Sequence, residues 1–132
     1  LNLCHLFTVD DLFFLKRGGR VSAATAVVGS ALGIKPMMHV DNDGHLIKIG
    51  IKRGRKGSIE ELCAMMQASA IDPAEQTVFI SHGDCIEDAE ALASQVKERF
   101  GVDVEIIAPV GPVIGSHSGP GTLALFYLGE HR

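Results

Sequence analysis

The sequence predicts an α/β fold with a mixed sheet, a β-hairpin, a βαβ unit and packed helices, all within one domain over residues 1–132. Three observations support this prediction. The chain has the length of a single domain, and its 46% hydrophobic content is enough to build a core. Only 5% of its residues are aromatic, which fits an α/β fold better than a β-sandwich. Segments with helical periodicity also alternate with short apolar runs that are typical of strands.

Two helices are predicted in the first quarter of the chain. Thr8-x-x-Asp11 is a capping signature, and the apolar run after it ends at Gly18, which we expect to be the C′ glycine. A second helix is predicted over Ser22–Leu32, with Ser22 as its N-cap and Gly33 as its stop. Its small residues would allow another segment to pack closely.

A β-hairpin is predicted next. Residues 37–40 and 46–52 read as strands, and the Asp-Asn-Asp-Gly sequence at 41–44 reads as the turn between them. Three isoleucines alternate with lysine and glycine along the second strand, so we expect one face of that strand to be dry and the other wet. The isoleucines are Ile47, Ile49 and Ile51.

The second half of the chain predicts a βαβ unit. One helix should start at the capping box Ser58-x-x-Glu61 and run to about residue 70. A later helix, with Asp84 as its cap and Gly101 as its stop, lies between two apolar runs that read as parallel strands. Those strands are expected at residues 77–81 and 102–108, and a final buried strand at residues 122–128.

Several classes of protein are disfavoured. No run of about 18 apolar residues is present, and the first residues lack the features of a signal peptide. The chain does not begin with Met, which is consistent with a fragment. Cys4, Cys63 and Cys85 show no CxxC spacing, so a reducing cytoplasm fits better than a disulfide framework. The six histidines form no ligand pair, and no metal site is expected.

The charge is divided unevenly. The net charge of −4 combines nine basic and four acidic residues in 1–56 with three basic and twelve acidic residues in 57–132. An anion-binding surface is therefore expected from the first half, which carries +5. Overall acidity and the shortage of aromatic residues disfavour nucleic acid as a partner.

The segment from Pro112 to Leu125 is the strongest candidate for a functional loop. Its glycines and prolines suit a rigid turn that lets backbone approach a ligand, and they would hold His117 and Ser118 in place. The alternative, a turn before a strand with an exposed histidine, has about equal weight on residue types alone. The residues expected to shape the loop are Gly115, Gly119, Pro120 and Gly121.

Each of three further motifs has two interpretations, one as a functional site and one as an ordinary structural feature. Arg20, in the Gly18-Gly19-Arg20 turn, suits a carboxylate or phosphate, although a solvated turn arginine is more common. The basic run at 52–56 reads as a loop or a hairpin end, without the Walker pattern that would make it a nucleotide site. Cys85 lies at a predicted helix N-terminus, where a thiol pKa can fall, but no base accompanies it.

Four segments together resemble the C-terminal part of the DegV family of fatty-acid-binding proteins, over nearly all of the chain. The Gly-Gly-Arg turn and the His-x-Gly-Pro-Gly segment are specific in combination. The segments are FFLKRGGRVS (13–22), GIKPMMHVDNDGHL (33–46), KRGRKG (52–57) and PVIGSHSGPGTLALFYLG (112–129).

This resemblance implies a bacterial two-domain α/β protein that encloses a long-chain fatty acid and presents its carboxylate to a separate fatty-acid kinase. His117, Ser118 and Arg20 would then serve carboxylate binding, and Arg53 and Arg55 would face the kinase or phosphate. The protein itself would be a carrier, with the fatty acid as ligand and no cofactor. The family's N-terminal domain, which completes the site, has no counterpart in this chain, and transient membrane contact stays open.

Two alternatives remain at this stage. One is a phosphoryl- or acyl-transfer enzyme domain, with His117 as general base and arginines clamping phosphate. The other is a scaffold or oligomerisation domain without a ligand. A missing nucleotide loop and a missing nucleophile beside the histidine favour the carrier.

Overall fold

The protein is described here by a computed structural model that covers residues 2–23 and 33–132. Its strands form one mixed sheet in the order β3-β2-β1-β6-β4-β5. The strands are β1 (Leu3–Thr8), β2 (Ile34–Val40), β3 (Leu46–Arg53), β4 (Val78–His82), β5 (Val104–Pro109) and β6 (Leu123–Leu128). The helices are α1 (Leu12–Arg17), α3 (Gly54–Ser69), α4 (Ile86–Phe100) and α5 (Pro112–Ser118), with a 3₁₀ turn at Pro73–Glu75.

The sheet confirms the predicted hairpin and βαβ unit. β2 and β3 pair antiparallel, while β4 and β5, joined through α4, pair parallel. β6 lies between β1 and β4 and is antiparallel to both. The N-terminal strand β1, which the sequence analysis did not anticipate, is therefore interior to the sheet, between β2 and β6.

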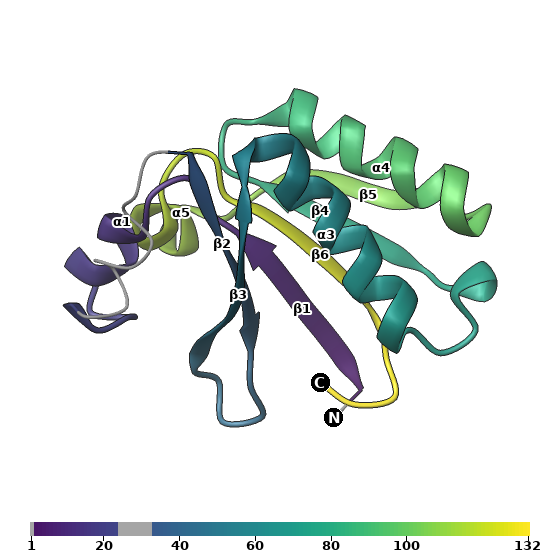
Figure 1. The fold of residues 1–132 in the computed structure, drawn as a ribbon, viewed down its shortest axis with the longest axis horizontal. Coiled ribbons are helices and arrows are strands. Elements are labelled where there is room, and N and C mark those ends of the chain that lie inside the picture. The colour runs from purple at the N-terminus through teal and green to yellow at the C-terminus, as the bar shows by residue number, and fades with distance from the viewer. Residues whose placement is uncertain (1, 24–32) are drawn as a thin grey trace.

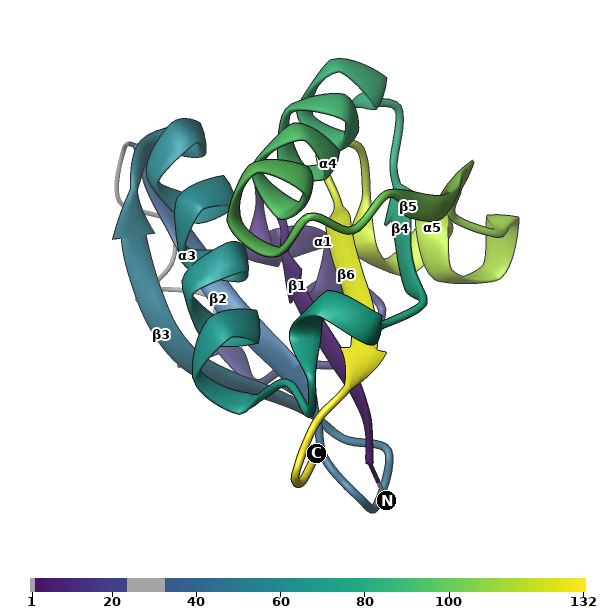
Figure 2. The same ribbon diagram turned by 90° about the vertical axis from the view of Figure 1, so that its right-hand side faces the viewer.

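The two faces of the sheet are covered differently (Figures 1 and 2). α3 and α4 pack side by side on one face over the larger core, which includes Leu62, Leu92 and Leu125. α1 and α5 pack together at one end of the other face over a smaller core around Phe7 and Leu12. Much of that second face lies beyond these two short helices, and this uncovered part holds the site described below.

The predicted helix starts were wrong in three places. Thr8 is the last residue of β1, and Asp11 caps α1 instead, because its carboxylate accepts a 2.8 Å hydrogen bond from the Phe13 amide. α3 begins at Gly54, so Ser58 lies inside the helix and donates to the Arg55 carbonyl. Cys85, with no side-chain capping bond, precedes α4, and Asp84 takes a φ of 53° just before it.

One expectation about loops was partly correct and another was wrong. The basic run at 52–56 includes the end of the hairpin strand β3, as one of its two interpretations had it, but continues as the first turn of α3. Residues 112–118, expected to be part of a loop, form α5. The left-handed residue after α1 is Gly19 (φ 71°), one position later than expected. Gly101 ends α4 as predicted, with a φ of 73°. The helix predicted over 22–32 falls mostly at 24–32, outside the described residues.

The isoleucines of β3 do not form a dry face. Burial does alternate along β3, but Ile47, Ile49 and Ile51 take the more exposed positions, at 38–47% exposure, and Leu46, Lys48 and Gly50 the less exposed ones. β3 is an edge strand of the sheet. Within the described part of the chain, no helix combines the length and apolar character needed to cross a membrane.

Candidate functional site

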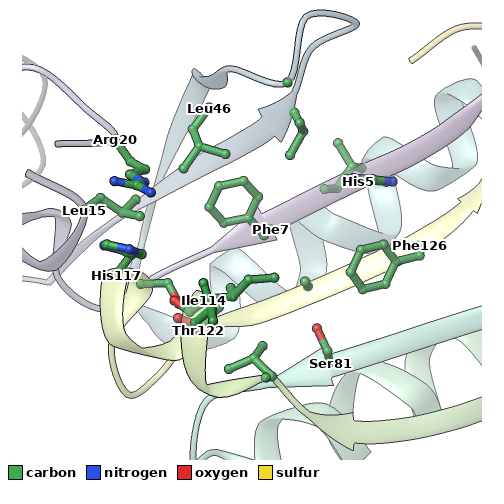
Figure 3. Close-up of a pocket in the computed structure, with 18 of the residues that line it drawn as sticks. His5, Phe7, Leu15, Arg20, Leu46, Ser81, Ile114, His117, Thr122 and Phe126 are labelled. Carbon is green, nitrogen blue, oxygen red and sulfur yellow. The ribbon is translucent and has the colours of Figure 1, made fainter. Parts of the chain in front are cut away.

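A pocket of about 500 Å³ lies on the face of the sheet that carries α1 and α5 (Figure 3). Its volume is within the range of small-molecule sites, roughly 300–1,000 Å³. Strands β1, β6 and β4 form the floor, α5 supplies one wall, and the Arg20 turn stands at one end. Most of the lining is aliphatic or aromatic, and none of the described lining residues is acidic.

The register of the sheet explains why this face is hollow. Ala124 of β6 lies directly opposite Ser81 of β4, so two adjacent strands present small side chains at the same level. On the other side of β6, Phe7 of β1 is opposite Ala124 and rises as a wall. A trough therefore follows β6 between the bulky residues of β1 and helix α5 (Figure 3).

His117 stands at one end of this trough, in the last turn of α5. Pro112 begins the short helix at a position where its missing N–H costs nothing, and Gly119 ends it. The imidazole lies against the backbone of Gly18, where an added Cβ would overlap Nδ1 and come within 3.0 Å of Cγ. Within residues 2–23 and 33–132 the ring has no hydrogen-bond partner, so both nitrogens are available to a ligand.

Arg20 shares this end of the trough with His117 (Figure 3). The end of α1 is tied by two backbone bonds, from Gly19 N to Lys16 O and from Arg20 N to Leu15 O. This Schellman arrangement turns the chain so that the exposed Arg20 guanidinium reaches back to the Gly18 carbonyl at 2.5 Å. One glycine therefore contacts both the imidazole and the guanidinium, and among the described residues no carboxylate pairs with Arg20.

The hydroxyl groups near His117 are already engaged. Ser118 is buried, and its hydroxyl donates to the Ile114 carbonyl at 2.9 Å. Thr122, a lining residue that the sequence analysis did not select, donates to the Gly119 carbonyl at 2.7 Å. Since a carboxylate only accepts hydrogen bonds, Ser118 would have to leave Ile114 before it contributed to such a ligand.

The glycines of the segment have different roles. Gly119 (φ 78°) lies against the ring of Phe14, 2.6 Å from where a Cβ would stand, and Gly121 (φ 79°) lies against the Asp10 carboxylate. Gly115, in contrast, is helical, and a Cβ there would meet only Val110 at 3.4 Å. Pro120 is exposed between the two constrained glycines.

Arg53 and Arg55 both lie outside the pocket. Arg53 is exposed at the junction of β3 and α3, and no described carboxylate pairs with it. Arg55 is 19% exposed and binds Asp88 at 2.8 Å, while its other nitrogens approach Asp10 at 3.6 Å and Cys85 Sγ at 3.3 Å. Arg55 therefore connects α3 to α4 and to the β1–α1 turn.

Cys85 is a half-buried thiol. Burial raises its pKa, although the nearby Arg55 charge acts in the opposite direction. Its Sγ donates to the Thr122 carbonyl at 3.2 Å, and its amide donates to His82 Nδ1. The pKa of this thiol is therefore raised and not lowered, which agrees with the interpretation of Cys85 as a small apolar residue.

The sequence analysis missed most of the trough. His5 and Phe7 belong to β1, which was not predicted, and Ser81, Ala124 and Phe126 were assigned only to buried strands. The alternation within residues 122–128 places Thr122, Ala124 and Phe126 on one face, and this signal identifies the lining once β6 is known to be central.

The fold and the pocket define a small α/β domain with an apolar pocket on one face of its sheet. A family model described as "Uncharacterised protein, DegV family" matches residues 2–130, and the chain belongs to the DegV family. It is 49% identical over 130 residues to a DegV domain-containing protein of Clostridium perfringens, covering 98% of this chain and 45% of that protein.

Solved structures show the same fold. A DegV family protein from Thermus thermophilus, described with fatty acid binding, is 32% identical with a TM-score of 0.77 over 97% of this chain and 46% of its own. The Streptococcus pneumoniae Fatty Acid Kinase (Fak) B3 protein, loaded with linoleic acid, is 19% identical with a TM-score of 0.86 over 98% of this chain and 45% of its own. The chain thus spans under half the length of these proteins.

Proposed function

We propose that this chain forms one half of a carrier that binds a long-chain fatty acid, with the carboxylate at the Arg20 and His117 end. The observation that carries the proposal is the polarity of the pocket. An apolar trough with cationic and hydrogen-bonding groups at one end, and no acidic residue in its described lining, matches a molecule that has an anionic head and a long apolar tail. Fatty acid binding by a relative that is 32% identical supports this ligand.

The apolar trough would supply affinity, and the Arg20 and His117 end would supply orientation. Each buried methylene stabilises the complex by about 0.8 kcal/mol, so the tail supplies most of the affinity. A hydrogen bond to a charged carboxylate contributes about 1.5–3 kcal/mol and fixes the direction of the chain. Arg20 can donate two parallel bonds, and His117 one. Ser118 stands behind His117 and supports α5 through its bond to Ile114.

A carrier is favoured over an enzyme by the state of the hydroxyl and thiol groups. Nucleophilic catalysis needs a hydroxyl or thiol beside a base. The hydroxyls of Ser118 and Thr122 donate to backbone carbonyls, and the Cys85 thiol has a raised pKa outside the pocket. His117 therefore has no activated nucleophile next to it among the described residues.

We extend this proposal to a cytoplasmic setting, which suits three free thiols.

The proposal includes presentation of the bound carboxylate to a fatty-acid kinase, with Arg53 on the contact surface. Arg53 is exposed and without a partner among the described carboxylates, so its charge is available to a second protein. Arg55 would support that surface by holding α3 against α4. The structural likeness to the Fak B3 protein motivates this part of the proposal.

Lipid extraction and mass spectrometry of the full-length protein test the ligand. We expect a co-purifying long-chain fatty acid, and His117→Ala should weaken rebinding of that acid by roughly ten- to a hundredfold. Ser116→Ala is a matched control, because Ser116 is exposed on the same helix and does not line the pocket. Protein that neither carries nor binds fatty acid would support the scaffold alternative instead.

A further inference from the structure

Bulky aromatic side chains lie in the trough at the end opposite His117. Phe126 of β6 is directly opposite His5 of β1 on one side and Phe79 of β4 on the other. The preceding row on this face contains the small Ala124 and Ser81. Going along β6 from the head end, the side chains of the floor are therefore small at Ala124. They are larger at Phe126, which Figure 3 shows beside His5.

The ring of Phe126 is held in place from β1. The His5 and Phe126 rings meet edge to face, with centroids 5.3 Å apart and an interplanar angle of 70°. His5 Nδ1 lies 3.1 Å from an Arg132 guanidinium nitrogen, which can only donate, so Nδ1 accepts and the imidazole is neutral with its proton on Nε2. Burial, together with the Arg132 charge, also lowers the His5 pKa, which favours the same neutral form.

The spacing along β6 sets the length of the trough. Thr122, Ala124 and Phe126 point to the same face, and four residues of strand span about 13 Å. The Phe126 ring therefore stands about this far along β6 from Thr122, on the side away from His117. A longer tail must bend away from β6 or leave the trough, and its extra methylenes then gain less burial.

We propose that Phe126, held by His5, determines the tail length that this pocket accepts. This inference rests on the proposed function, since it assumes a fatty acid with its carboxylate at the His117 end. Phe126 is a specificity-determining residue in this reading, and Phe79 is not, because Phe79 shares the row but does not line the pocket.

The test is a titration of the full-length protein with saturated fatty acids that lengthen by two methylenes at each step. For the unmodified protein, affinity should rise by about tenfold per step up to a limiting length and then stop rising. Phe126→Ala should move that limit at least one step longer, so the first acid beyond the original limit binds about tenfold more tightly. Phe126→Trp should move the limit one step shorter.

Phe79→Ala is the matched control, because it removes an aromatic ring from the same row without opening the trough. Phe126→Leu serves if the alanine variant is unstable, and it should give a smaller shift in the same direction. The same limiting length in folded Phe126→Ala, Phe126→Leu and Phe126→Trp proteins would overturn this inference while leaving the carrier function intact. If the unmodified protein bound no fatty acid of any length, the proposed function would fail and this inference with it.

Discussion

Gly18 and His117 are in direct contact, and this contact fixes the head end of the pocket. The φ of Gly18 is −76°, an ordinary helical value, so its backbone does not require glycine. The requirement comes from the His117 ring, which occupies the space that a Cβ would need. A residue in the turn after α1 therefore determines where a side chain from α5, almost a hundred positions later, can lie.

Gly18→Ala should therefore weaken ligand binding in the same way as a mutation of His117 itself. Because the new methyl group displaces the imidazole, we expect fatty acid affinity to fall by roughly ten- to a hundredfold, as for His117→Ala, with little change in the free energy of unfolding. Isothermal titration and thermal unfolding of the full-length variant provide both values. Combining Gly18→Ala with His117→Ala should cost no more affinity than either change alone, since both remove the same contact. Fully additive losses would contradict this explanation.

Gly119→Ala should act on stability instead. Gly119 has a φ of 78° and a ψ of 176°, a region that other residues avoid at a cost of roughly 1–3 kcal/mol. The added Cβ would also meet the Phe14 ring at 2.6 Å, and Phe14 cannot retreat freely because Arg17 stacks over it at 4.5 Å. We expect the melting temperature to fall by several degrees.

The Phe14→Ala background separates the two causes of this loss. With the ring absent, Gly119→Ala should retain the backbone cost and lose the steric cost, so its effect should be smaller there than in the unmodified protein. Gly111→Ala, at a φ of −60° and with open space around it, should leave the melting temperature almost unchanged. An equal effect of Gly119→Ala in both backgrounds would show that the Phe14 contact is unimportant.

The local elements that could be predicted are those with a strong periodic or turn signal. The hairpin followed from its Asp-Asn-Asp-Gly turn, and the βαβ unit followed from an amphipathic helix between apolar runs. β1 gave no such signal, because four of its six residues are buried and they do not alternate along the strand. A strand whose buried residues do not alternate carries no period-two signal in the sequence.

The site was harder to predict, since tertiary contacts decide its geometry. α5 has only seven residues and contains Gly115, so its intrinsic helix propensity is low, and packing against α1 stabilises it. The start of α3 at Gly54 depends on a backbone bond to the Gly33 carbonyl, a residue far away in sequence, rather than on Ser58 as a cap. Arg20 and His117 could be selected from sequence motifs, but the position of the trough could be predicted only with knowledge of how the strands pair.

The three thiols should be less reactive than ordinary cysteines at neutral pH. Burial raises the pKa of Cys63 from 9.0 to about 11 and also raises the pKa values of Cys4 and Cys85. Because the pKa of each thiol is higher in the folded than in the unfolded state, the folded protein has its full stability below the unfolded-state pKa of 9.0. That stability falls as the pH rises toward the folded-state pKa. We therefore expect slow labelling by a disulfide reagent at pH 8, and a fall in stability between about pH 9 and 11.

The variants of the three thiols separate their contributions. Cys85 is the most accessible of the three and should label first, whereas Cys4 and Cys63 are buried and should label only as the protein unfolds. Cys63→Ala should reduce the loss of stability at high pH, at the cost of a small cavity. Rapid labelling of Cys85 at pH 7 would show a reactive thiolate and would reopen the enzyme alternative.

Arg53 and Arg55 should respond differently to mutation, although only one residue separates them. Arg55→Ala removes a guanidinium that is 19% exposed and leaves Asp88 without its 2.8 Å partner, so we expect a loss of about 1–3 kcal/mol in the free energy of unfolding. Arg53→Ala removes an exposed charge that no described carboxylate binds, and its effect on stability should stay within about 0.5 kcal/mol.

The same variant tests the kinase contact. If Arg53 contacts a fatty-acid kinase, the Arg53→Ala protein should keep full affinity for fatty acid, but the kinase should phosphorylate the bound fatty acid much more slowly. Parallel binding and phosphorylation assays on the full-length protein, with Lys56→Ala as a neighbouring exposed-charge control, measure the difference. Equal losses in both assays for Arg53→Ala would instead assign this arginine to the binding of the ligand, while an unchanged phosphorylation rate would remove it from the kinase contact.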